Sequence, residues 1–187
     1  MMAYAFARFD FPGKEWFFRA LLLGLMIPSM MLIIPQFVLT KQLHLIDNLW
    51  ALVLFYVSGN LALNTFLLRS FFEGIPRELD EAMEVDGANV LTRYWRLAMP
   101  LARPALATTV IFTFLATWDE FAWALTVIST ETKRTLPIAI QLFHGQNSTQ
   151  WGLVFAASLI AILPVIVVYL VFQRHFVAGL TAGAVKG

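Results

Sequence analysis

The residue types that carry most enzyme chemistry are scarce in this sequence. It contains no cysteine, which excludes disulfides, thiolate nucleophiles and cysteine metal sites. Its three histidines, His44, His144 and His175, are far apart, whereas metal-ligating histidines usually cluster. We interpret each as an ordinary loop or interface residue. No G-x-x-x-x-G-K-[ST] run is present, so no ATP-hydrolysing site is expected. The sequence predicts no catalytic residue and no metal site.

The remaining candidates for chemistry are two carboxyl groups in apolar surroundings. Asp119 and Glu120 lie roughly 27 Å along a predicted helix that begins at Leu101, at about 1.5 Å per residue. Ionisable groups within membrane spans are costly and usually face a cavity or a partner. One interpretation is that both acids reach water near the lipid headgroups, and the other is that they line a path for a polar solute. The residues alone leave both open.

A charged segment, residues 72–104, interrupts the apolar sequence. Five arginines and six acidic residues lie between Arg69 and Arg103, and long apolar runs flank them on both sides. A polar connector between two membrane spans must stay in water or against a water-soluble partner. The segment is therefore a candidate for an interaction site.

Local signals in this segment predict two short helices. Pro76 suits a first helical position, and the acids that follow it suit the helix dipole. Gly87 is typical of a left-handed helix end, and Asn89 can cap a second helix. An apolar stripe is expected on the first helix, formed by Ile75, Leu79, Ala82 and Met83. By spacing alone, a hairpin lying on lipid headgroups is equally compatible with this pattern.

The elements on either side of this segment have the composition of membrane spans. Of the 187 residues 59% are hydrophobic and 13% are charged, and the mean hydropathy is +0.73. Soluble domains carry about 25% charged residues. Runs of about twenty apolar residues can cross a membrane. Such runs predict an all-α, polytopic membrane protein with about four spans, at 16–39, 49–68, 101–128 and 151–172.

Prolines and amides within the spans give more specific expectations. Pro28 and Pro35 should kink the first span. Asn60 and Asn64 are four residues apart, so they share one face of the second span, and that face should point into the helix bundle.

The distribution of Lys and Arg predicts the orientation. Ten of these residues lie in segments 1–19, 69–103 and 173–187, and three lie in the loops 40–48 and 129–150. The positive-inside rule therefore places the charged segment and the C-terminus in the cytoplasm. The two outer loops are too short for a folded domain, so capture of a solute outside the membrane requires another protein. Residues 1–15 do not form a signal peptide.

Two motifs resemble ABC importer permeases of the carbohydrate-uptake branch. The run E-A-M-x-x-D-G-A at 81–88, followed by R-L-A-M-P-L at 96–101 and Pro104, is similar to the EAA loop of that family. Met83 stands where the family usually has a second alanine. The resemblance implies that the loop docks onto a cytoplasmic ATPase subunit through Glu81, Ala82, Met83, Asp86, Gly87 and Ala88.

The C-terminal residues 173–187 resemble the tail of the same permeases. Read alone, this tail is a flexible terminus. The resemblance implies ATPase contacts at Gly179, Thr181, Gly183 and Lys186, and a C-terminus that is complete. Residues 3–9, A-Y-A-F-A-R-F, resemble the cytoplasmic end of a span. Because the family usually has about six spans, the chain is expected to lack the N-terminal ones, whether by truncation, a chosen boundary or a genuinely short form.

The segment T-W-D-E-F at 117–121 resembles the family's Trp-Asn-(Asp/Glu)-Phe sequence near the translocation path. Asp119 replaces the usual asparagine, which leaves a cationic solute open. The resulting candidates for the solute path are Asn60, Asn64, Trp118, Asp119 and Glu120.

These observations predict one transmembrane domain, 1–187, with a cytoplasmic coupling loop at 72–104. We expect a non-enzymatic permease subunit of a bacterial ABC importer for a sugar or polyol, in the inner membrane. Expected partners are a dimer of ATP-binding subunits, a second permease subunit, an extracytoplasmic solute-binding protein and lipid, but no nucleic acid. No cofactor is expected, since ATP binds the partner subunit. Alternatives are a permease for polyamines or other cationic solutes, and a truncated scaffold that transports nothing.

Overall fold

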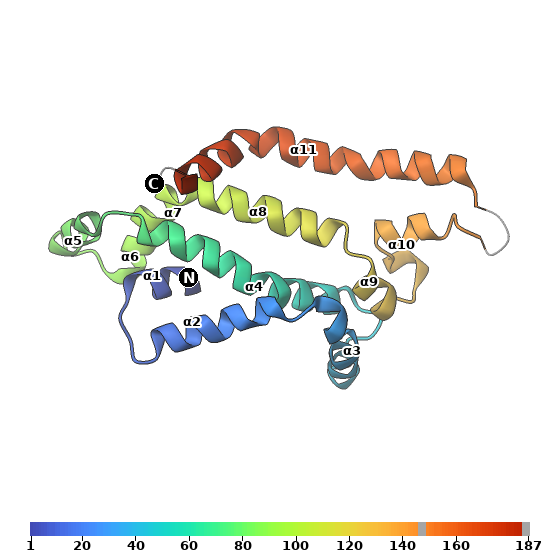
Figure 1. Cartoon of the computed structure of the whole chain (residues 1–187), viewed down its shortest axis with the longest axis horizontal. Helices are drawn as coiled ribbons and strands as arrows, with labels where there is room; N and C mark the ends of the chain where they lie inside the picture. Colours follow the sequence, from blue (N-terminus) through green and yellow to red (C-terminus); the bar gives the residue numbers. More distant parts are fainter. Residues whose placement is uncertain (146–148, 185–187) are drawn as a thin grey trace. The chain divides into compact units, whose positions relative to one another are not determined.

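The computed structural model describes residues 1–145 and 149–184, with side chains as far as Gln173. The prediction of an all-α protein is confirmed. Within the described residues the only extended pairing is an isolated antiparallel bridge between His144 and Thr149. The α-helices (Figure 1) are α1 (Met2–Arg8), α2 (Lys14–Leu23), α3 (Ile33–Gln42), α4 (Leu49–Glu73), α5 (Arg77–Val85), α6 (Val90–Arg93), α7 (Met99–Leu101), α8 (Arg103–Trp118), α9 (Ala122–Val127), α10 (Leu136–Gln141) and α11 (Trp151–Ala184).

Four shorter helical segments connect them. Three are 3₁₀-helices: η1 (Gly24–Met26), η2 (Ser29–Leu32) and η4 (Glu131–Lys133). The fourth, η3 (Tyr94–Ala98), is π-helical and joins α6 to α7. Pro100 follows this π-helical segment and has no N–H to donate to an earlier turn.

Two helices are long and apolar enough to cross a membrane, α4 and the Trp151–Gln173 part of α11. The number is four if each of two broken helix pairs counts as one span. These pairs are Lys14–Met26 with Ser29–Gln42, and Val90–Leu101 with Arg103–Trp118, the second bent by 74°. The predicted second and fourth spans are therefore continuous helices, and the first and third are broken.

In the first predicted span the break lies at Pro28, between η1 and η2. Pro28 has an extended backbone with ψ 128°, and it cannot donate the hydrogen bond that would continue the helix. The expectation for Pro28 is confirmed. Pro35 behaves differently, because it lies in the first turn of α3, where an N–H has no partner within the helix.

The third predicted span, 101–128, is wrong as a single helix, because α8 ends at Trp118 and α9 begins at Ala122. The Glu120 carboxylate lies at this break. It accepts hydrogen bonds from the backbone N–H of Trp123 at 2.7 Å and of Ala124 at 3.1 Å. These are first-turn donors that would otherwise have no partner. The acid therefore starts a new helix inside an apolar run.

The chain forms two compact units, and the division falls within α4, α8 and α11. Unit 1 contains 1–26, 60–112 and the residues from 172 onward, and unit 2 contains 27–59 and 113–171. In unit 1, the ring of Tyr4 packs edge-on against Phe72 and Tyr94, with centroids 5.5 and 5.2 Å away. The core of unit 1 joins α1 to the end of α4 and to η3, and its buried residues are Ala3, Tyr4, Ala7, Phe72, Ile75, Tyr94, Ala98 and Ala102.

The core of unit 2 lies between the first turns of α4 and the short helices α9 and α10. Phe55 packs edge-on against Trp123 with ring centroids 4.7 Å apart. The buried residues are Ala51, Leu52, Trp123, Ala124, Val127, Ile128 and Ile138.

In unit 2, hydrogen bonds of Asp47 connect the loop before α4 with the loop after α9. Its carboxylate accepts the N–H of Ser129 at 2.9 Å, the N–H of Thr130 at 2.8 Å and the Thr130 hydroxyl at 2.5 Å. The Lys133 ammonium donates to this carboxylate at 3.0 Å and to the Asp47 carbonyl at 2.6 Å. Sequence reasoning did not single out Asp47, because its partners are more than eighty residues away.

This arrangement predicts a pH-dependent stability. The hydrogen bonds from Thr130, Ser129 and Lys133 hold the pKa of Asp47 well below its usual range. A lowered folded-state pKa stabilises the protein above the unfolded value of about 3.9, and this stabilisation is lost as the pH falls below it. We expect Asp47→Asn to lower the thermal unfolding midpoint in detergent by several degrees at pH 7. The difference from the wild type should begin to shrink below about pH 4.

Glu131→Gln is the matched control, because the Glu131 side chain is exposed in the same loop and is not a partner of Asp47. A midpoint for Asp47→Asn equal to that of the control at pH 7 would contradict the structural role of Asp47.

Candidate functional site

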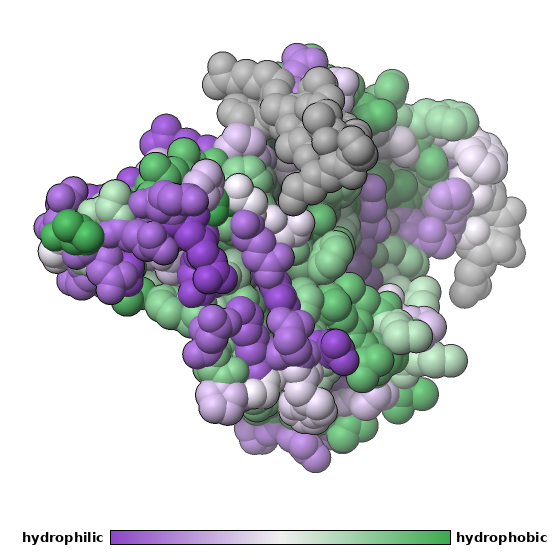
Figure 2. Space-filling model, turned by 60° about the vertical axis from the view of Figure 1, so that its left-hand side comes forward, coloured by the Kyte–Doolittle hydropathy of each residue, from purple (hydrophilic) through white to green (hydrophobic). Residues whose placement is uncertain are grey.

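Helix α5 is a polar element of unit 1 with no fully buried residue, and its ends follow from local sequence. It begins at Arg77, directly after Pro76, with Glu78 and Asp80 in the first turn. The predicted start is therefore correct to within one residue. In Figure 2 hydrophilic side chains gather at the end of the molecule that carries α5.

The C-terminal end of α5 is closed by Gly87, as the sequence predicted. Gly87 has a left-handed backbone with φ +82°. Its N–H donates to the carbonyl of Glu84, and the N–H of Ala88 donates to the carbonyl of Met83, both at 2.9 Å. This pair of bonds is a Schellman motif, which requires the left-handed residue that glycine supplies most easily. Asn89 then caps α6 by accepting the N–H of Thr92 at 2.8 Å, as expected.

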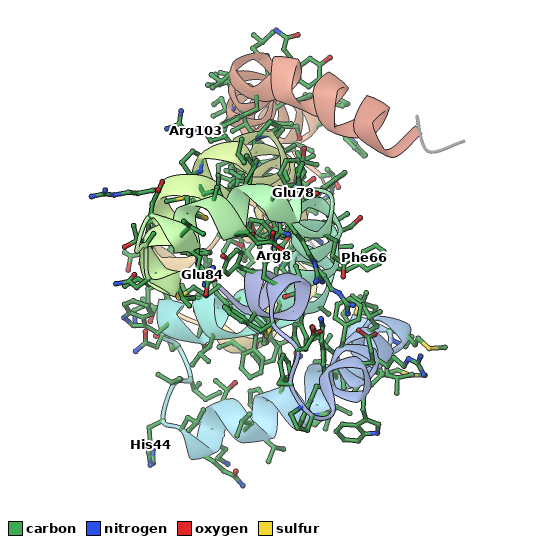
Figure 3. All side chains as sticks on the ribbon, turned by 90° about the vertical axis from the view of Figure 1, so that its left-hand side faces the viewer. Arg8, His44, Phe66, Glu78, Glu84 and Arg103 are labelled. Carbon is green, nitrogen blue, oxygen red and sulfur yellow. The ribbon has the colours of Figure 1, made fainter. Side chains whose placement is uncertain are left out.

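Two acids of α5 pair with arginines of neighbouring helices; the side chain of Asp80 is largely buried, whereas that of Glu84 is exposed. Asp80 forms an ion pair with Arg8 of α1, with 3.1 Å between Nε and Oδ2. One turn later, Glu84 forms an ion pair with Arg93 of α6. Figure 3 views this end of the protein, with Arg8, Glu78 and Glu84 labelled.

The apolar residues of α5 are left at the surface. Leu79 is 42% exposed and Val85 is 89% exposed. Ala82 is exposed and Met83 is half-buried. Of the predicted stripe, only Ile75, which precedes the helix, belongs to the core. The docking face, as we define it, consists of the exposed residues Leu79, Glu81, Ala82, Val85, Asp86 and Gly87.

The candidates for the solute path lie in both units. Asn60 and Asn64 are half-buried in the unit 1 part of α4 and share one face of that helix, as the spacing predicted. Trp118, Asp119 and Glu120 belong to unit 2. We describe each group in its own unit.

Asp119 lines an open pocket in unit 2 of about 330 Å³. Its side chain is exposed and, among the described residues, has no hydrogen-bond or ion-pair partner. Trp118 is fixed beside it, because its indole N–H donates to the Ala161 carbonyl at 3.1 Å and its ring stacks on Phe114 at 5.3 Å. The pocket is lined by Trp118, Asp119, Phe121, Leu136, Pro137, Ile140, Gln141 and Ala161.

Glu120 has a different environment from its neighbour. Besides starting α9, its carboxylate accepts the Tyr56 hydroxyl of α4 at 2.8 Å. Both of its carboxylate oxygens therefore accept hydrogen bonds within unit 2. The sequence signal for this role was its place just before a short helix, where acids commonly cap. Of the two acids, only Asp119 is available to a ligand.

The backbone of α11 is helical as far as Ala184 and includes residues 173–184 of the tail. Gly179, Thr181 and Gly183 lie in this helix, and Lys186 lies outside the described residues. Their predicted contact with an ATPase stays a prediction. Among the residues that the structure describes, no three His, Cys, Asp or Glu side chains are grouped as a metal site requires.

Comparison with known proteins agrees with these features. Residues 1–181 match the family model of the binding-protein-dependent transport system inner membrane component. The chain is 39% identical over its whole length to the trehalose transport system permease protein SugB of Mycobacterium tuberculosis, of which it covers 69%. It is 38% identical to the sulfoquinovosyl glycerol transport system permease protein SmoH of Agrobacterium fabrum, again over its whole length, and covers 66% of that relative.

A third relative, the trehalose/maltose transport system permease protein MalG of Thermococcus litoralis, is 37% identical over the whole chain, which covers 68% of it. The chain thus spans about two thirds of the length of these relatives. A match over nearly every residue, together with relatives of this identity, is sufficient to assign the family. The chain belongs to the family of inner membrane components of binding-protein-dependent transport systems.

Proposed function

We propose that this protein is a permease subunit of an ABC importer, and that α5 couples it to a separate ATP-binding subunit. The observation that carries the proposal is the orientation of α5. Asp80 is held against Arg8, and the docking face, with Leu79 42% and Val85 89% exposed, points away from the core of unit 1. An apolar surface on a polar element is typical of a protein interaction site.

The proposed mechanism is alternating access. The excess of Lys and Arg in the segments around α5 supports a cytoplasmic location for this helix and for the C-terminus. Closure of two ATP-binding subunits would displace α5, and α5 would move the spans to which it is attached. A second permease subunit and an extracytoplasmic solute-binding protein complete the proposed assembly. Glu81, Ala82, Met83, Asp86, Gly87 and Ala88 would contact the ATP-binding subunit, as would the end of α11.

The proposed solute is a carbohydrate or polyol. The relatives described above are named for trehalose, maltose and sulfoquinovosyl glycerol. The pocket beside Trp118 pairs an aromatic residue with the available carboxylate of Asp119, which suits the apolar faces and the hydroxyls of a sugar. A polyamine is less favoured, because Glu120 is occupied by Tyr56 and by α9, so that Asp119 alone remains to neutralise several cationic charges.

The docking role of α5 is tested by Gly87→Pro. Proline cannot adopt φ +82° and has no N–H to donate to Glu84, so the Schellman motif and the docking face should be lost. We expect recovery of the co-expressed ATP-binding subunit to fall at least tenfold in detergent pull-downs, while the amount of membrane-inserted protein is unchanged.

Gly59→Ala is the control, because an added Cβ there meets no atom within 4 Å and the backbone is helical. It should bind like the wild type. If the wild type itself retains no ATP-binding subunit, the chain is a non-transporting scaffold and the proposed function is wrong.

The solute class is tested at Asp119 in the reconstituted importer. An amide can still hydrogen-bond to hydroxyls, so Asp119→Asn should change the KM for trehalose or maltose uptake by less than about threefold. Asp119→Leu removes a charged hydrogen bond of about 1.5–3 kcal/mol and should raise KM roughly tenfold or more. Glu131→Gln again serves as the control. Uptake of putrescine that Asp119→Asn abolishes would favour the cationic solute instead.

A further inference from the structure

Arg8, the last residue of α1, is a buried charge that the docking role does not explain. Its side chain is 7% exposed, and its ion pair with Asp80 is largely screened from water, since Asp80 is only 15% exposed. A second guanidinium nitrogen donates to the Ile75 carbonyl at 2.7 Å. A buried charge is costly unless it is paired and hydrogen-bonded. Arg8 therefore binds both α5 and the chain that leads into it.

Tyr4 supports the same contact from one turn earlier on α1. Its hydroxyl donates to the other Asp80 oxygen at 3.3 Å, while its ring packs in the core against Phe72 and Tyr94. Burial raises the pKa of Tyr4, and the Asp80 carboxylate raises it further, so the phenol remains a donor at neutral pH. Residues four apart lie on one helix face. Asp80 is thus held by two side chains of one rigid helix.

The covalent connections of α5 contain glycine on both sides of the helix and proline at one end. On one side the chain passes through Gly74 to Pro76, whose extended backbone separates α4 from α5. On the other side it passes through Gly87 in the left-handed region. The side-chain contacts of α5 with α1 and α6 are a second connection, in addition to the backbone.

The helix α1 is in turn attached to other elements of unit 1. Phe6 packs against Phe18 of α2, with ring centroids 5.5 Å apart. The Arg69 guanidinium of α4 lies 4.0 Å above the Phe18 ring, and it forms ion pairs of 2.7 Å with Glu15 and Glu73. A displacement of α1 consequently reaches both α2 and the end of α4.

From these contacts we propose that Arg8 and Tyr4 are positioning residues for coupling: through Asp80 they transmit the displacement of α5 to α1, and from there to α2 and α4. This inference rests on the proposed function. It adds that the Arg8–Asp80 pair governs how much transport each ATP drives, and not whether the ATP-binding subunit docks, since the docking face lies on the other side of α5.

The test measures ATP hydrolysis and sugar uptake together in proteoliposomes containing the complete importer. We expect Asp80→Asn and Arg8→Gln to retain the ATP-binding subunit and at least half of the ATPase rate. The number of sugars transported per ATP should fall at least fivefold. The double charge reversal Arg8→Asp with Asp80→Arg should recover at least half of the wild-type ratio, because it restores the pair. A role confined to folding would lower both rates equally and leave the ratio unchanged.

Lys14→Gln is the matched control, since Lys14 forms an ion pair with Asp10 at 3.1 Å that does not involve α5. It should leave the ratio at the wild-type value. Single variants that dock, hydrolyse ATP and transport with the wild-type ratio would overturn the coupling inference alone. A wild type that neither docks nor transports would overturn the proposed function and this inference with it. If the single variants do not assemble with the ATP-binding subunit, the double charge reversal decides. A reversal that restores neither assembly nor the number of sugars transported per ATP also overturns the coupling inference.

Discussion

The pairing of Arg8 with Asp80 connects one side of α5 to α1. In most amphipathic helices the apolar stripe is buried and the charged side is solvated. Here one acid of α5, Asp80, is largely buried against Arg8 of α1, while Glu84 pairs with Arg93 of α6 at the surface. The apolar residues of α5 are excluded from the core and remain at the surface. The pairing leaves Leu79 and Val85 in contact with water, and it offsets part of the cost of burying the Arg8 and Asp80 charges.

Local signals in the sequence predicted α5 and α6 well, but they could not predict which side of α5 faces the rest of unit 1. Pro76, Gly87 and Asn89 act within a few residues, so the ends of both helices were readable from sequence. The apolar stripe was also predicted, but its direction depends on Arg8, which lies far from Asp80 in the chain. Periodicity shows that a helix has two faces, and only tertiary contacts show which face is covered. The division of the chain into two compact units likewise had no sequence signal.

The third predicted span shows that hydropathy alone cannot predict where a helix breaks. Hydropathy continues through 101–128, so a single helix was expected. The carboxylate of Glu120 instead binds two backbone N–H groups and the Tyr56 hydroxyl, and these bonds offset the cost of ending one helix and starting another. The neighbouring Asp119 makes no such bonds among the described residues and lines a pocket. Two adjacent acids in the same break between α8 and α9 therefore have different environments, and one of them caps the helix that follows.

Met83 illustrates how the docking face can vary while its framework is kept. The residue stands where related permeases usually have a second alanine, and its side chain is half-buried on α5. Its contribution to the Schellman motif is its backbone carbonyl, which accepts the N–H of Ala88 whatever the side chain is. The substitution therefore leaves the end of α5 unchanged and alters only the surface chemistry beside Leu79. Since methionine is long and flexible, the proposed partner must accommodate a larger and more adaptable side chain at this point. Backbone geometry thus fixes the end of α5, and a side chain such as that of Met83 can vary without changing it.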